Sequence, residues 1–474
     1  MAEPDFDFIV IGGGSAGYAG ASTAARLGLK TAVIEGGRDV GGLCILRGCM
    51  PSKALLESAH RAEAIRAAGE FGLRAEYFGA DGAAIRARKR RLIAEFADHR
   101  RQQLESGNFE FIRGEAAFVD SHTVSVRLLD GGQRRLTARA FLIATGSRVK
   151  CHGIPGLHDV GFWTSDDLLD ADRIPASVVI LGGGAIGLEA ASYYAGLGSR
   201  VSVIQRSGQV LKETDADVAA AITEALEHRG VEIFRGTALV RVERDGGAKC
   251  VHFTHAGAPR FILAEEIICA LGREPAIEAL ELARAGVAVE RGAIVADARQ
   301  RCGPEHIFAA GDVCGPFEVV HIAIQQAEVA ARNAARLQQR LDGPIEEMDY
   351  RLALFAVFTQ PQVAAIGLTE REARKIEPGV RVAKHPFADH GKSMIRGETH
   401  GFVKLIAAGE TCRILGAACV GPEASELIHE IAVAMHFRAT ARDLARVPHY
   451  HPTLSEIWTY TAEELCGEES LSPP

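Results

Sequence analysis

Cysteine is scarce in this sequence, and several other features are missing that would identify particular classes of protein. Ten cysteines in 474 residues are too few for a disulfide-stapled scaffold. There is no excess of positive charge, since the formal net charge is -8, which argues against nucleic acid and anionic lipid as partners. With 47% hydrophobic and 24% charged residues, we expect an ordinary globular protein with a large core.

The sequence also lacks a clear membrane span or targeting signal. Residues 8–25 carry no charge, but five of them are glycine, and a β-branched run gives way to a Gly/Ala/Ser pattern. That change is typical of a strand, a tight loop and a helix rather than of one spanning helix. The acidic start, Met1 to Asp7, leads directly into the predicted strand and does not resemble a signal peptide. We therefore expect a cytoplasmic protein without a membrane partner.

What the sequence does contain is a copy of itself, displaced by 170 residues. Each copy predicts an apolar strand, a G-x-G-x-x-G turn, an Ala-rich helix and a second strand, which together make a βαβ dinucleotide-binding unit. The matching glycines are Gly12, Gly14 and Gly17 in the first copy and Gly182, Gly184 and Gly187 in the second. The start of each helix offers free N–H groups to phosphates, so Ser15, Ala16 and Ile186 are further candidates for cofactor binding.

The two copies differ at the position that selects the nucleotide. The first has Glu35, an acid that accepts hydrogen bonds from a ribose diol and suits an adenosine without a 2′-phosphate. The second has Gln205, followed by the cations Arg206 and Lys212, which favour NADPH. Two observations keep NAD open. The cations are equally compatible with a solvated surface, and Gly187 is more typical of NAD sites.

A close pair of cysteines lies between the repeats, in the segment Gly41-Gly-Leu-Cys44-Ile-Leu-Arg-Gly-Cys49-Met-Pro51-Ser-Lys53. Pro51 suits the first position of a helix, which puts Cys49 just ahead of the helix, where the dipole stabilises a thiolate. Thiolate character is what disulfide exchange and electron donation to a flavin require. Gly42 leaves room for a cofactor to approach closely.

Zinc binding is the alternative for these two cysteines. It would need two more ligands at suitable spacing, and no second pair of cysteines follows, so we expect no metal. The remaining cysteines are scattered, and the default expectation for each is a small buried side chain. They are Cys151, Cys250, Cys269, Cys302, Cys314, Cys412, Cys419 and Cys466.

The motifs together resemble the class I pyridine nucleotide–disulfide oxidoreductases, and the resemblance extends over residues 6–465. The G-G-x-C-x3-G-C-x-P-S-K segment is highly specific to that family. The resemblance implies an α/β fold with two Rossmann-like domains, for FAD and for NAD(P), and an α+β C-terminal dimerisation domain. The implied segments are 1–150 for FAD, 151–276 for NAD(P), 277–345 for the return to FAD and 346–474 for the interface.

The resemblance also implies roles for individual residues. Cys49 would be the thiol next to the flavin, and Cys44 the thiol that exchanges with substrate. Lys53 would lie near flavin N5 with Glu189 as its ion-pair partner, and Asp312 would accept a hydrogen bond from the ribitol. A helix beginning near His321 would direct its dipole at the flavin. The other implied positions are Ala116, Thr145, Gly146, Gly311 and Ala323 for FAD, and Gly272 and Arg273 for the nicotinamide domain.

Near the carboxy terminus, His451-Pro-Thr-Leu-Ser-Glu456 resembles the family's H-P-T-x-x-E motif. A histidine can relay protons to a thiol near neutral pH, and a carboxylate on its other nitrogen fixes the tautomer. Residues five apart diverge by about 140° on a helix, so we expect His451 on the loop ahead of it. His449 is more consistent with a supporting or packing role. The resemblance implies a homodimer in which His451 serves the cysteines of the other subunit.

The substrate is less constrained than the reaction. The motifs around Lys53 and His451 look most like dihydrolipoyl dehydrogenase, which normally uses NAD and has an acid at the position of Gln205. Glutathione reductase usually has a Tyr where this chain has Ala185. Mercuric reductase replaces the H-P-T-x-x-E motif and ends in paired cysteines, whereas this tail has only Cys466.

The leading prediction is therefore a dihydrolipoyl-dehydrogenase-like enzyme that contains FAD, uses NADP or NAD with NADP slightly favoured, and acts on a small disulfide or dithiol. The alternatives are an NADPH-dependent enzyme like glutathione or mercuric reductase, and a flavin transhydrogenase or quinone reductase that needs no substrate thiol. A redox-inactive FAD-binding scaffold would require loss of a cysteine or of His451, and all three residues are present.

Overall fold

The computed structural model describes residues 3–150 and 152–467. The chain divides into two compact units, each assembled from three separate stretches of sequence. The first unit comprises residues 1–52, 87–151 and 272–349, and the second comprises residues 53–86, 152–271 and 350–474. Two of the points where the chain passes from one unit to the other lie within helices, namely α3 (Cys49–Ala67) and α4 (Gly82–Glu105).

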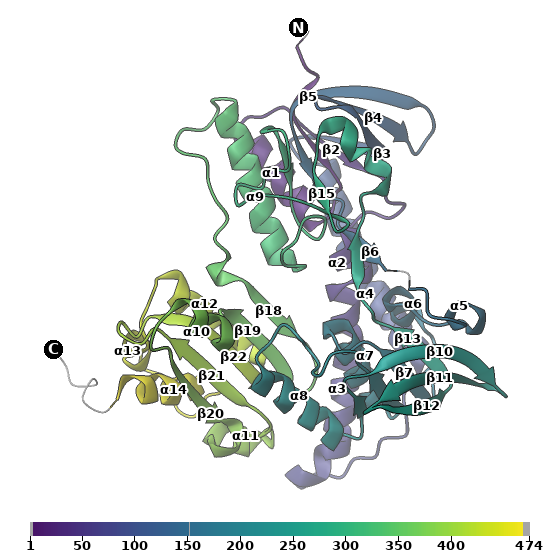
Figure 1. The fold of residues 1–474 in the computed structure, drawn as a ribbon, viewed down its shortest axis with the longest axis vertical. Helices are drawn as coiled ribbons and strands as arrows, with labels where there is room; N and C mark the ends of the chain where they lie inside the picture. Colours follow the sequence, from purple (N-terminus) through teal and green to yellow (C-terminus); the bar gives the residue numbers. More distant parts are fainter. Residues whose placement is uncertain (1–2, 151, 468–474) are drawn as a thin grey trace. The chain divides into compact units, whose positions relative to one another are not determined.

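The first unit is built on a parallel sheet in the order β3-β2-β1-β5-β17. These strands are β1 (Phe6–Ile11), β2 (Thr31–Glu35), β3 (Glu110–Asp120), β5 (Gln133–Ile143) and β17 (Ile307–Ala309). The remaining parts of β3 and β5 pair with β4 (Thr123–Leu128) in an antiparallel extension. Helices α1 (Ser15–Arg26) and α9 (Val320–Leu337) lie side by side (Figure 1), because Gly20 lets α1 approach Ala327 closely.

The smaller elements of the first unit connect this sheet to the return segment. They are α2 (Gly42–Arg47), β6 (Ser147–Val149), β14 (Arg273–Pro275), β15 (Val289–Glu290) and β16 (Ala293–Ile294). Strands β6 and β14 pair in antiparallel fashion and so hold together two segments that are about 125 residues apart in the sequence.

The second unit contains a parallel sheet in the order β13-β7-β8-β9, with an antiparallel sheet β10-β11-β12 packed against it. The parallel strands are β7 (Ser177–Leu181), β8 (Arg200–Ile204), β9 (Glu232–Phe234) and β13 (Glu266–Cys269). The antiparallel strands are β10 (Ala238–Asp245), β11 (Ala248–His255) and β12 (Ala258–Ala264). The helices here are α5 (Leu157–Val160), α6 (Ser165–Asp170), α7 (Ala185–Leu197) and α8 (Ala216–His228).

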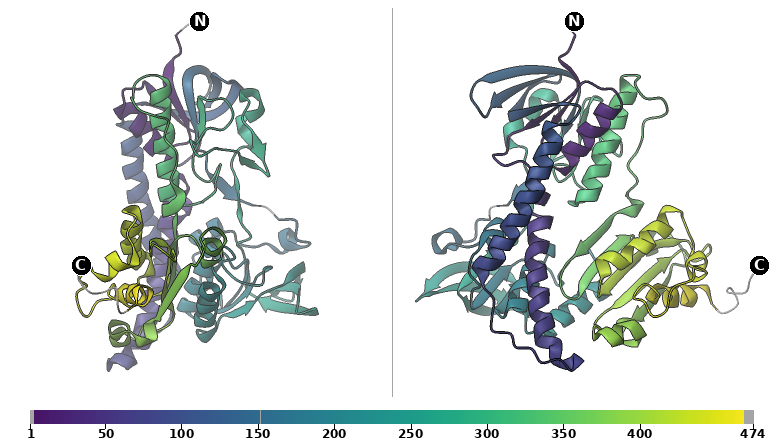
Figure 2. Two further views of the ribbon diagram at one scale, coloured as in Figure 1. Left: turned by 60° about the vertical axis from the view of Figure 1, so that its left-hand side comes forward. Right: turned by 180° about the vertical axis from the view of Figure 1, so that it is seen from behind.

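The carboxy-terminal part of the second unit is a five-stranded antiparallel sheet in the order β18-β19-β22-β21-β20. Its strands are β18 (Leu354–Val357), β19 (Gln362–Gly367), β20 (Arg381–Pro386), β21 (Phe402–Ala407) and β22 (Ile414–Gly421). Helices α12 (Ala424–His436) and α14 (Ile457–Cys466) pack on this sheet (Figure 2). The shorter helices are α10 (Glu370–Ile376), α11 (Gly391–Arg396) and α13 (Ala441–Ala445).

This architecture confirms the predicted fold class, with two Rossmann-like βαβ arrangements and an α+β carboxy-terminal part. The division into four segments stays a prediction. The structure groups most of residues 151–276 with 350–474 in one compact unit. Among the described residues, no helix is both long enough and apolar enough to cross a bilayer.

The two copies of the repeat have closely matching backbones. Gly12 and Gly182 both have φ of +106°, and a Cβ on either would lie 2.4 Å from a carbonyl oxygen, that of Ala144 or of Ala270. A side chain is therefore excluded at both positions by backbone conformation and by space. By contrast, Gly184 has φ of -81° and open space around the position of a Cβ.

This difference predicts unequal tolerance to alanine within one turn. Gly182→Ala should lower the free energy of unfolding by at least about 2 kcal/mol, because the new Cβ meets the oxygen of Ala270 in a strained conformation. Gly184→Ala should cost less than about 1 kcal/mol, since its conformation is ordinary. Urea unfolding of the two variants beside the unaltered protein measures both values. Equal losses would contradict the backbone argument.

Candidate functional site

The first glycine turn is held by the carboxylate at the end of β2. Glu35 Oε2 accepts a hydrogen bond from the Gly13 amide at 2.7 Å, and its Oε1 accepts one from the Gly37 amide at 2.6 Å. Gly14, the residue just before α1, has no side chain with which to cap the helix. The first N–H groups of the helix, including those of Ser15 and Ala16, therefore have no side-chain cap at this turn. This donor set fits the diphosphate of a dinucleotide.

The second turn is built in the same way with a neutral residue. Gln205 Oε1 accepts a hydrogen bond from the Gly183 amide at 2.7 Å, as Glu35 does from Gly13. The Gln205 amide nitrogen donates to the hydroxyl of Ser207. Gln205 therefore keeps the structural function of the acid while removing its negative charge. Ile186 and Gly187 lie in the first turn of α7.

The two cations predicted to read a 2′-phosphate lie on the loop that follows β8. Arg206 and Lys212 are both exposed, and the Lys212 ammonium lies 3.2 Å from the Glu213 carboxylate. The Leu211 amide donates to the Gly183 carbonyl at 2.9 Å, so this loop contacts the glycine turn directly. The location of Arg206 and Lys212 is therefore compatible with a phosphate on the ribose of a nucleotide bound at this turn.

Gly42 approaches the first glycine turn, as its sequence context predicted. A Cβ on Gly42 would lie 2.5 Å from the Gly14 Cα, and the φ of Gly42 is +69°. Gly42, the first residue of α2, thus lets the start of this helix contact the glycine turn. No side chain separates the two backbones at that point.

The return segment forms a network around Asp312. The Ser147 hydroxyl donates to Asp312 Oδ2 at 2.6 Å, and Arg273 Nε donates to the same hydroxyl oxygen at 2.9 Å. Burial, reinforced by Asp312, raises the pKa of the Glu318 carboxyl group. Asp312 is thereby fixed beside a cation and a second acid, with its remaining oxygen available to a hydroxyl-bearing ligand such as a ribitol.

Helix α9 begins at Val320, close to the predicted start at His321. The Gly311 amide donates to the fully buried side chain of Gln326 at 2.8 Å, and a Cβ on Gly311 would meet Ala323 at 3.3 Å. The amino end of α9 is therefore tied to the loop that bears Asp312. We did not predict a role for Gln326 from the sequence, because the sequence shows only that this residue lies about one turn inside a predicted helix.

The remaining predicted cofactor positions are found on the strands and turns of the first unit. The Thr145 hydroxyl donates to the Ala276 carbonyl at 2.8 Å, and the Ala276 amide donates to the Gly146 carbonyl at 2.9 Å. Ala116 is buried in β3. Gly272 has φ of +119° and precedes β14. These residues position the connection between the two parts of the first unit.

The two cysteines of the candidate redox pair lie on consecutive helices. Cys44 is in α2, and Cys49 is the first residue of α3. Helix α3 therefore begins two residues earlier than we predicted from the position of Pro51. The reason is the Gly48 carbonyl, which accepts a hydrogen bond from the Ser52 amide at 3.2 Å and so starts the helix. Pro51 remains within the first turn, where a missing N–H breaks no helical bond.

A partly buried cation interacts with Cys44. The Arg100 guanidinium stacks over the Tyr18 ring at 4.3 Å and interacts electrostatically with Cys44. Burial lowers the pKa of this guanidinium. A positive charge at this location favours the thiolate form of a cysteine. Arg100 was not among the predicted residues, because it follows Cys44 by more than 50 positions in an Arg-rich helix.

Lys53 and Glu189 form the ion pair that the family resemblance implied. The Lys53 ammonium lies 2.8 and 2.9 Å from the two oxygens of Glu189. Glu189 also accepts a hydrogen bond from the Phe358 amide at 3.0 Å, and the ammonium lies over the Phe358 ring at 4.5 Å. The carboxylate is buried, so it fixes the direction of the lysine side chain.

His451 lies on the loop ahead of α14, as predicted, with its Nδ1 3.0 Å from Glu456 Oε2. The histidine side chain is 79% exposed, whereas that of Glu456 is 9% exposed. The imidazole is thus held from behind by a buried carboxylate and presents its other nitrogen to the surface.

A second histidine, His390, lies behind the same carboxylate. It is fully buried, its Nε2 lies 3.5 Å from Glu456 Oε1, and its Nδ1 lies 2.9 Å from the Ser393 hydroxyl. Burial lowers the pKa of His390 and so favours its neutral form. His390 could not be predicted from the sequence, because it precedes His451 by about 60 residues and matches none of the family motifs.

His449 has a different partner from His451. Its Nε2 lies 2.6 Å from Glu430, and its Nδ1 lies 2.9 Å from the Val447 carbonyl, which favours the supporting role. Among the scattered cysteines, the expectation of burial is confirmed for Cys250, Cys269, Cys302 and Cys419, while Cys314, Cys412 and Cys466 are partly exposed. Cys151 lies outside the described residues.

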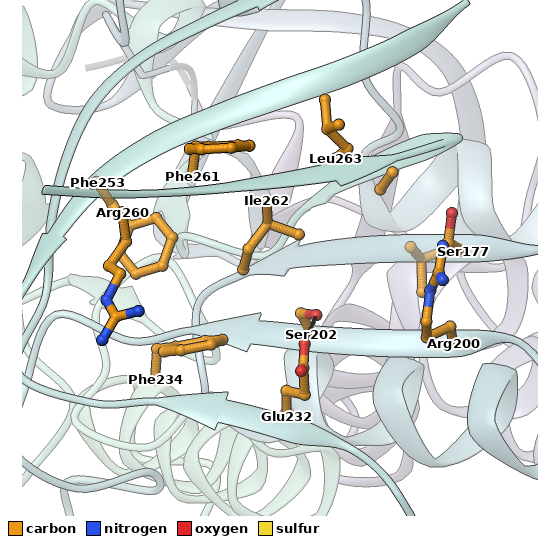
Figure 3. A pocket seen from close by; sticks show the side chains of 12 residues that line it. Ser177, Arg200, Ser202, Glu232, Phe234, Phe253, Arg260, Phe261, Ile262 and Leu263 are labelled. Atoms are coloured by element: carbon orange, nitrogen blue, oxygen red, sulfur yellow. Dashed lines mark hydrogen bonds between the residues drawn. The ribbon is translucent and has the colours of Figure 1, made fainter.

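A cavity of about 330 Å³ lies between the β7-β8-β9 strands and β12 (Figure 3). Its lining includes Ser177 and Arg200, which are the first residues of β7 and β8, together with Phe234 and Phe253. A dinucleotide binds outside the opposite, carboxyl ends of parallel strands. This cavity is therefore separate from the glycine turn at the end of β7.

Comparison with known proteins gives a consistent set of matches. A family model described as pyridine nucleotide-disulphide oxidoreductase matches residues 6–327, and that family's dimerisation-domain model matches residues 355–462. The chain is 35% identical over 460 residues to a dihydrolipoyl dehydrogenase from Chlamydia trachomatis serovar D, covering 96% of each chain. It is also 35% identical over 454 residues to a mercuric reductase from Bacillus cereus, covering 95% of this chain and 70% of that protein.

Among solved structures, the chain is similar to the Cu(II) complex of the HOCl-induced flavoprotein disulfide reductase RclA from Escherichia coli. The TM-score is 0.84 at 27% sequence identity, and the match covers 98% of this chain and 99% of that chain.

Proposed function

The chain belongs to the pyridine nucleotide–disulphide oxidoreductase family, and we propose that it carries electrons from NADPH through Cys44 and Cys49 to a small disulfide of the lipoamide type. The class of the enzyme follows from the family: it is a flavoprotein disulfide oxidoreductase that uses FAD and a pyridine nucleotide, and it contains the family's dimerisation domain. The substrate, the preferred nucleotide and the residue roles are our proposals.

The single observation that carries the proposal is the His451–Glu456 hydrogen bond at 3.0 Å. A thiol that exchanges with a substrate disulfide needs a group that gives and takes protons, whereas reduction of a metal ion does not. The imidazole is exposed and its tautomer is fixed by a buried acid, which suits proton transfer to a sulfur on another surface.

The exchange steps balance with two electrons and two protons. Cys44 attacks one sulfur of the substrate disulfide, which forms a mixed disulfide and expels the first substrate thiolate. Cys49 then attacks the Cys44 sulfur, releasing the second thiolate and closing a Cys44–Cys49 disulfide. His451 of the partner subunit would protonate the thiolates as they leave. The glycine turn held by Glu35 and the network around Asp312 would hold FAD, which would supply electron-pair transfer between the nicotinamide and the cysteines.

Several residues would support this chemistry without reacting. Lys53, fixed by Glu189, would supply a positive charge beside the flavin, and Asp312 would hold the ribitol. Arg100 would favour the Cys44 thiolate. We also propose a cytoplasmic location, because a reducing compartment keeps such a dithiol available.

A metal-ion reductase is the second candidate function. Its support comes from two relatives, a mercuric reductase and a flavoprotein disulfide reductase solved as a Cu(II) complex. Against it stands the histidine–glutamate pair, which reduction of a metal ion does not require.

Steady-state assays with lipoamide, glutathione disulfide, Hg(II) and Cu(II), each with NADH and NADPH, test the proposed substrate class. We expect lipoamide to be turned over with the highest kcat/KM. Cys44→Ser should abolish disulfide reduction, because the attacking thiol is lost, while any quinone reduction should persist. An absence of lipoamide turnover with both nucleotides would contradict the proposal, and turnover of the metal ions alone would favour the second candidate.

The nucleotide preference is tested at the loop after β8. Arg206→Ala should raise the KM for NADPH by at least about tenfold, because one charged hydrogen bond to the 2′-phosphate is lost, and should change the KM for NADH much less. Gln205→Glu keeps the acceptor for the Gly183 amide but adds a negative charge, so it should shift the preference toward NADH. Arg260→Ala, at an exposed arginine on β12, serves as control. Equal effects of Arg206→Ala on both nucleotides would remove the basis for NADPH.

His390 is proposed as a positioning residue for the proton relay. Its Nε2 lies 3.5 Å from Oε1 of the same Glu456 carboxylate whose Oε2 contacts His451. In His390→Phe the carboxylate loses this neighbour and holds His451 less firmly, so kcat for disulfide reduction should fall by at least about tenfold. A purely structural role would lower quinone reduction, which needs no proton relay to a thiol, by the same factor.

A further inference from the structure

Strands β10, β11 and β12 form an antiparallel sheet (Figure 1). This sheet carries a second group of ionisable side chains. Glu243 on β10 is directly opposite Cys250 on β11, and His252 lies two residues further along β11. Alternate residues of a strand point to the same face, so Cys250 and His252 share a face with Glu243. Their ligand atoms, one from each residue, all lie within 4.8 Å of one another.

The three side chains meet at one imidazole nitrogen. His252 Nε2 lies 2.7 Å from Glu243 Oε1 and 3.3 Å from Cys250 Sγ. A single N–H cannot point well at an oxygen and a sulfur at the same time. A cation between the three atoms would satisfy all of them at once, because each then contributes a lone pair.

This face of the sheet is not the one that builds the core. Val242, Val251 and Phe253 alternate with the three residues and belong to the apolar core shared with the parallel sheet. The group combines a buried thiol, a partly buried imidazole and an exposed carboxylate. Such a gradient leaves water access on one side, where a solvent molecule can complete the coordination.

We propose that Glu243, Cys250 and His252 form a zinc-binding site with water as the fourth ligand. Thiolate, imidazole and carboxylate are the donors that Zn²⁺ takes in proteins, and an all-oxygen cation such as Mg²⁺ or Ca²⁺ would not select a thiol. The site does not depend on the proposed function, since it uses none of the residues assigned to electron transfer or nucleotide binding.

The distances require little rearrangement. In a tetrahedral zinc site the sulfur and nitrogen ligands are about 3.5 Å apart and the nitrogen and oxygen ligands about 3.3 Å apart. The sulfur–nitrogen distance of 3.3 Å is already close to that value. The nitrogen–oxygen distance of 2.7 Å must open by about 0.6 Å, which the exposed Glu243 side chain can provide.

Arg241 is the charged neighbour that opposes binding. Its guanidinium pairs with the second oxygen, Oε2, of Glu243. Oε1 remains directed at His252, so the carboxylate can serve both groups. The arginine should weaken metal binding without preventing it.

The test measures Zn²⁺ binding by the full-length holoenzyme in equilibrium dialysis, with Co²⁺ as a spectroscopic substitute. We expect His252→Gln and Cys250→Ser each to lower the affinity for one Zn²⁺ per chain by at least about tenfold. Cys250→Ser should also remove a thiolate-to-Co²⁺ charge-transfer band from the difference spectrum. Arg241→Gln should bind at least as tightly as the unaltered protein.

Matched variants separate this site from other metal-binding groups. His255→Gln lies on the same strand but on the opposite face, and Cys412→Ser removes a partly exposed thiol elsewhere. Both should bind Zn²⁺ like the unaltered protein. FAD content and circular dichroism verify that each variant is folded. Unchanged affinity and stoichiometry in folded His252→Gln and Cys250→Ser would overturn the proposal.

Discussion

The hydrogen bond from a glycine amide to the side chain at the end of the second strand is the constraint on which both nucleotide sites depend. In one turn the acceptor is Glu35 and in the other it is Gln205, at nearly the same distance of 2.7 Å. This bond fixes the turn that leads into each helix, and the turn leaves the first N–H groups of the helix free for the phosphates of the proposed nucleotides. Because an amide oxygen can replace a carboxylate in this function, the position is free to change its charge. Nucleotide preference can therefore vary here without loss of the fold.

The sequence predicted those features that depend on local geometry. Residues such as Gly12 and Gly182 are required by a positive φ and by a neighbouring carbonyl, so they recur in the chain wherever the same turn is built. The Lys53–Glu189 pair and the His451–Glu456 pair were also predictable, because motif resemblance assigns a partner to each residue. The exact start of α3 was not, since it depends on the Gly48 carbonyl rather than on Pro51.

Contacts between distant segments could not be predicted in the same way. His390 reaches Glu456 only because the loop before α11 packs behind the loop before α14. Glu243 is opposite Cys250 only through the register of β10 and β11, and a search for paired cysteines overlooks a site with one cysteine. Arg100 is one of many arginines in α4, and nothing in the periodicity of that helix distinguishes it. In each case the missing information is strand register or helix docking.

The different exposures of His451 and Glu456 bear on how the site is completed. A carboxylate that is 9% exposed loses most of its hydration, and its hydrogen bond to the imidazole compensates for part of that cost. A histidine that is 79% exposed gains nothing from burial, so its fixed orientation has no structural benefit within one chain. The arrangement makes sense when another surface covers the imidazole and receives its proton. Both residues lie within the match to the dimerisation domain at 355–462, which agrees with the proposal that a second copy of the chain supplies this surface. Under that proposal the cysteine pair and His451, some 400 residues apart in the sequence, would meet only across an interface between two copies.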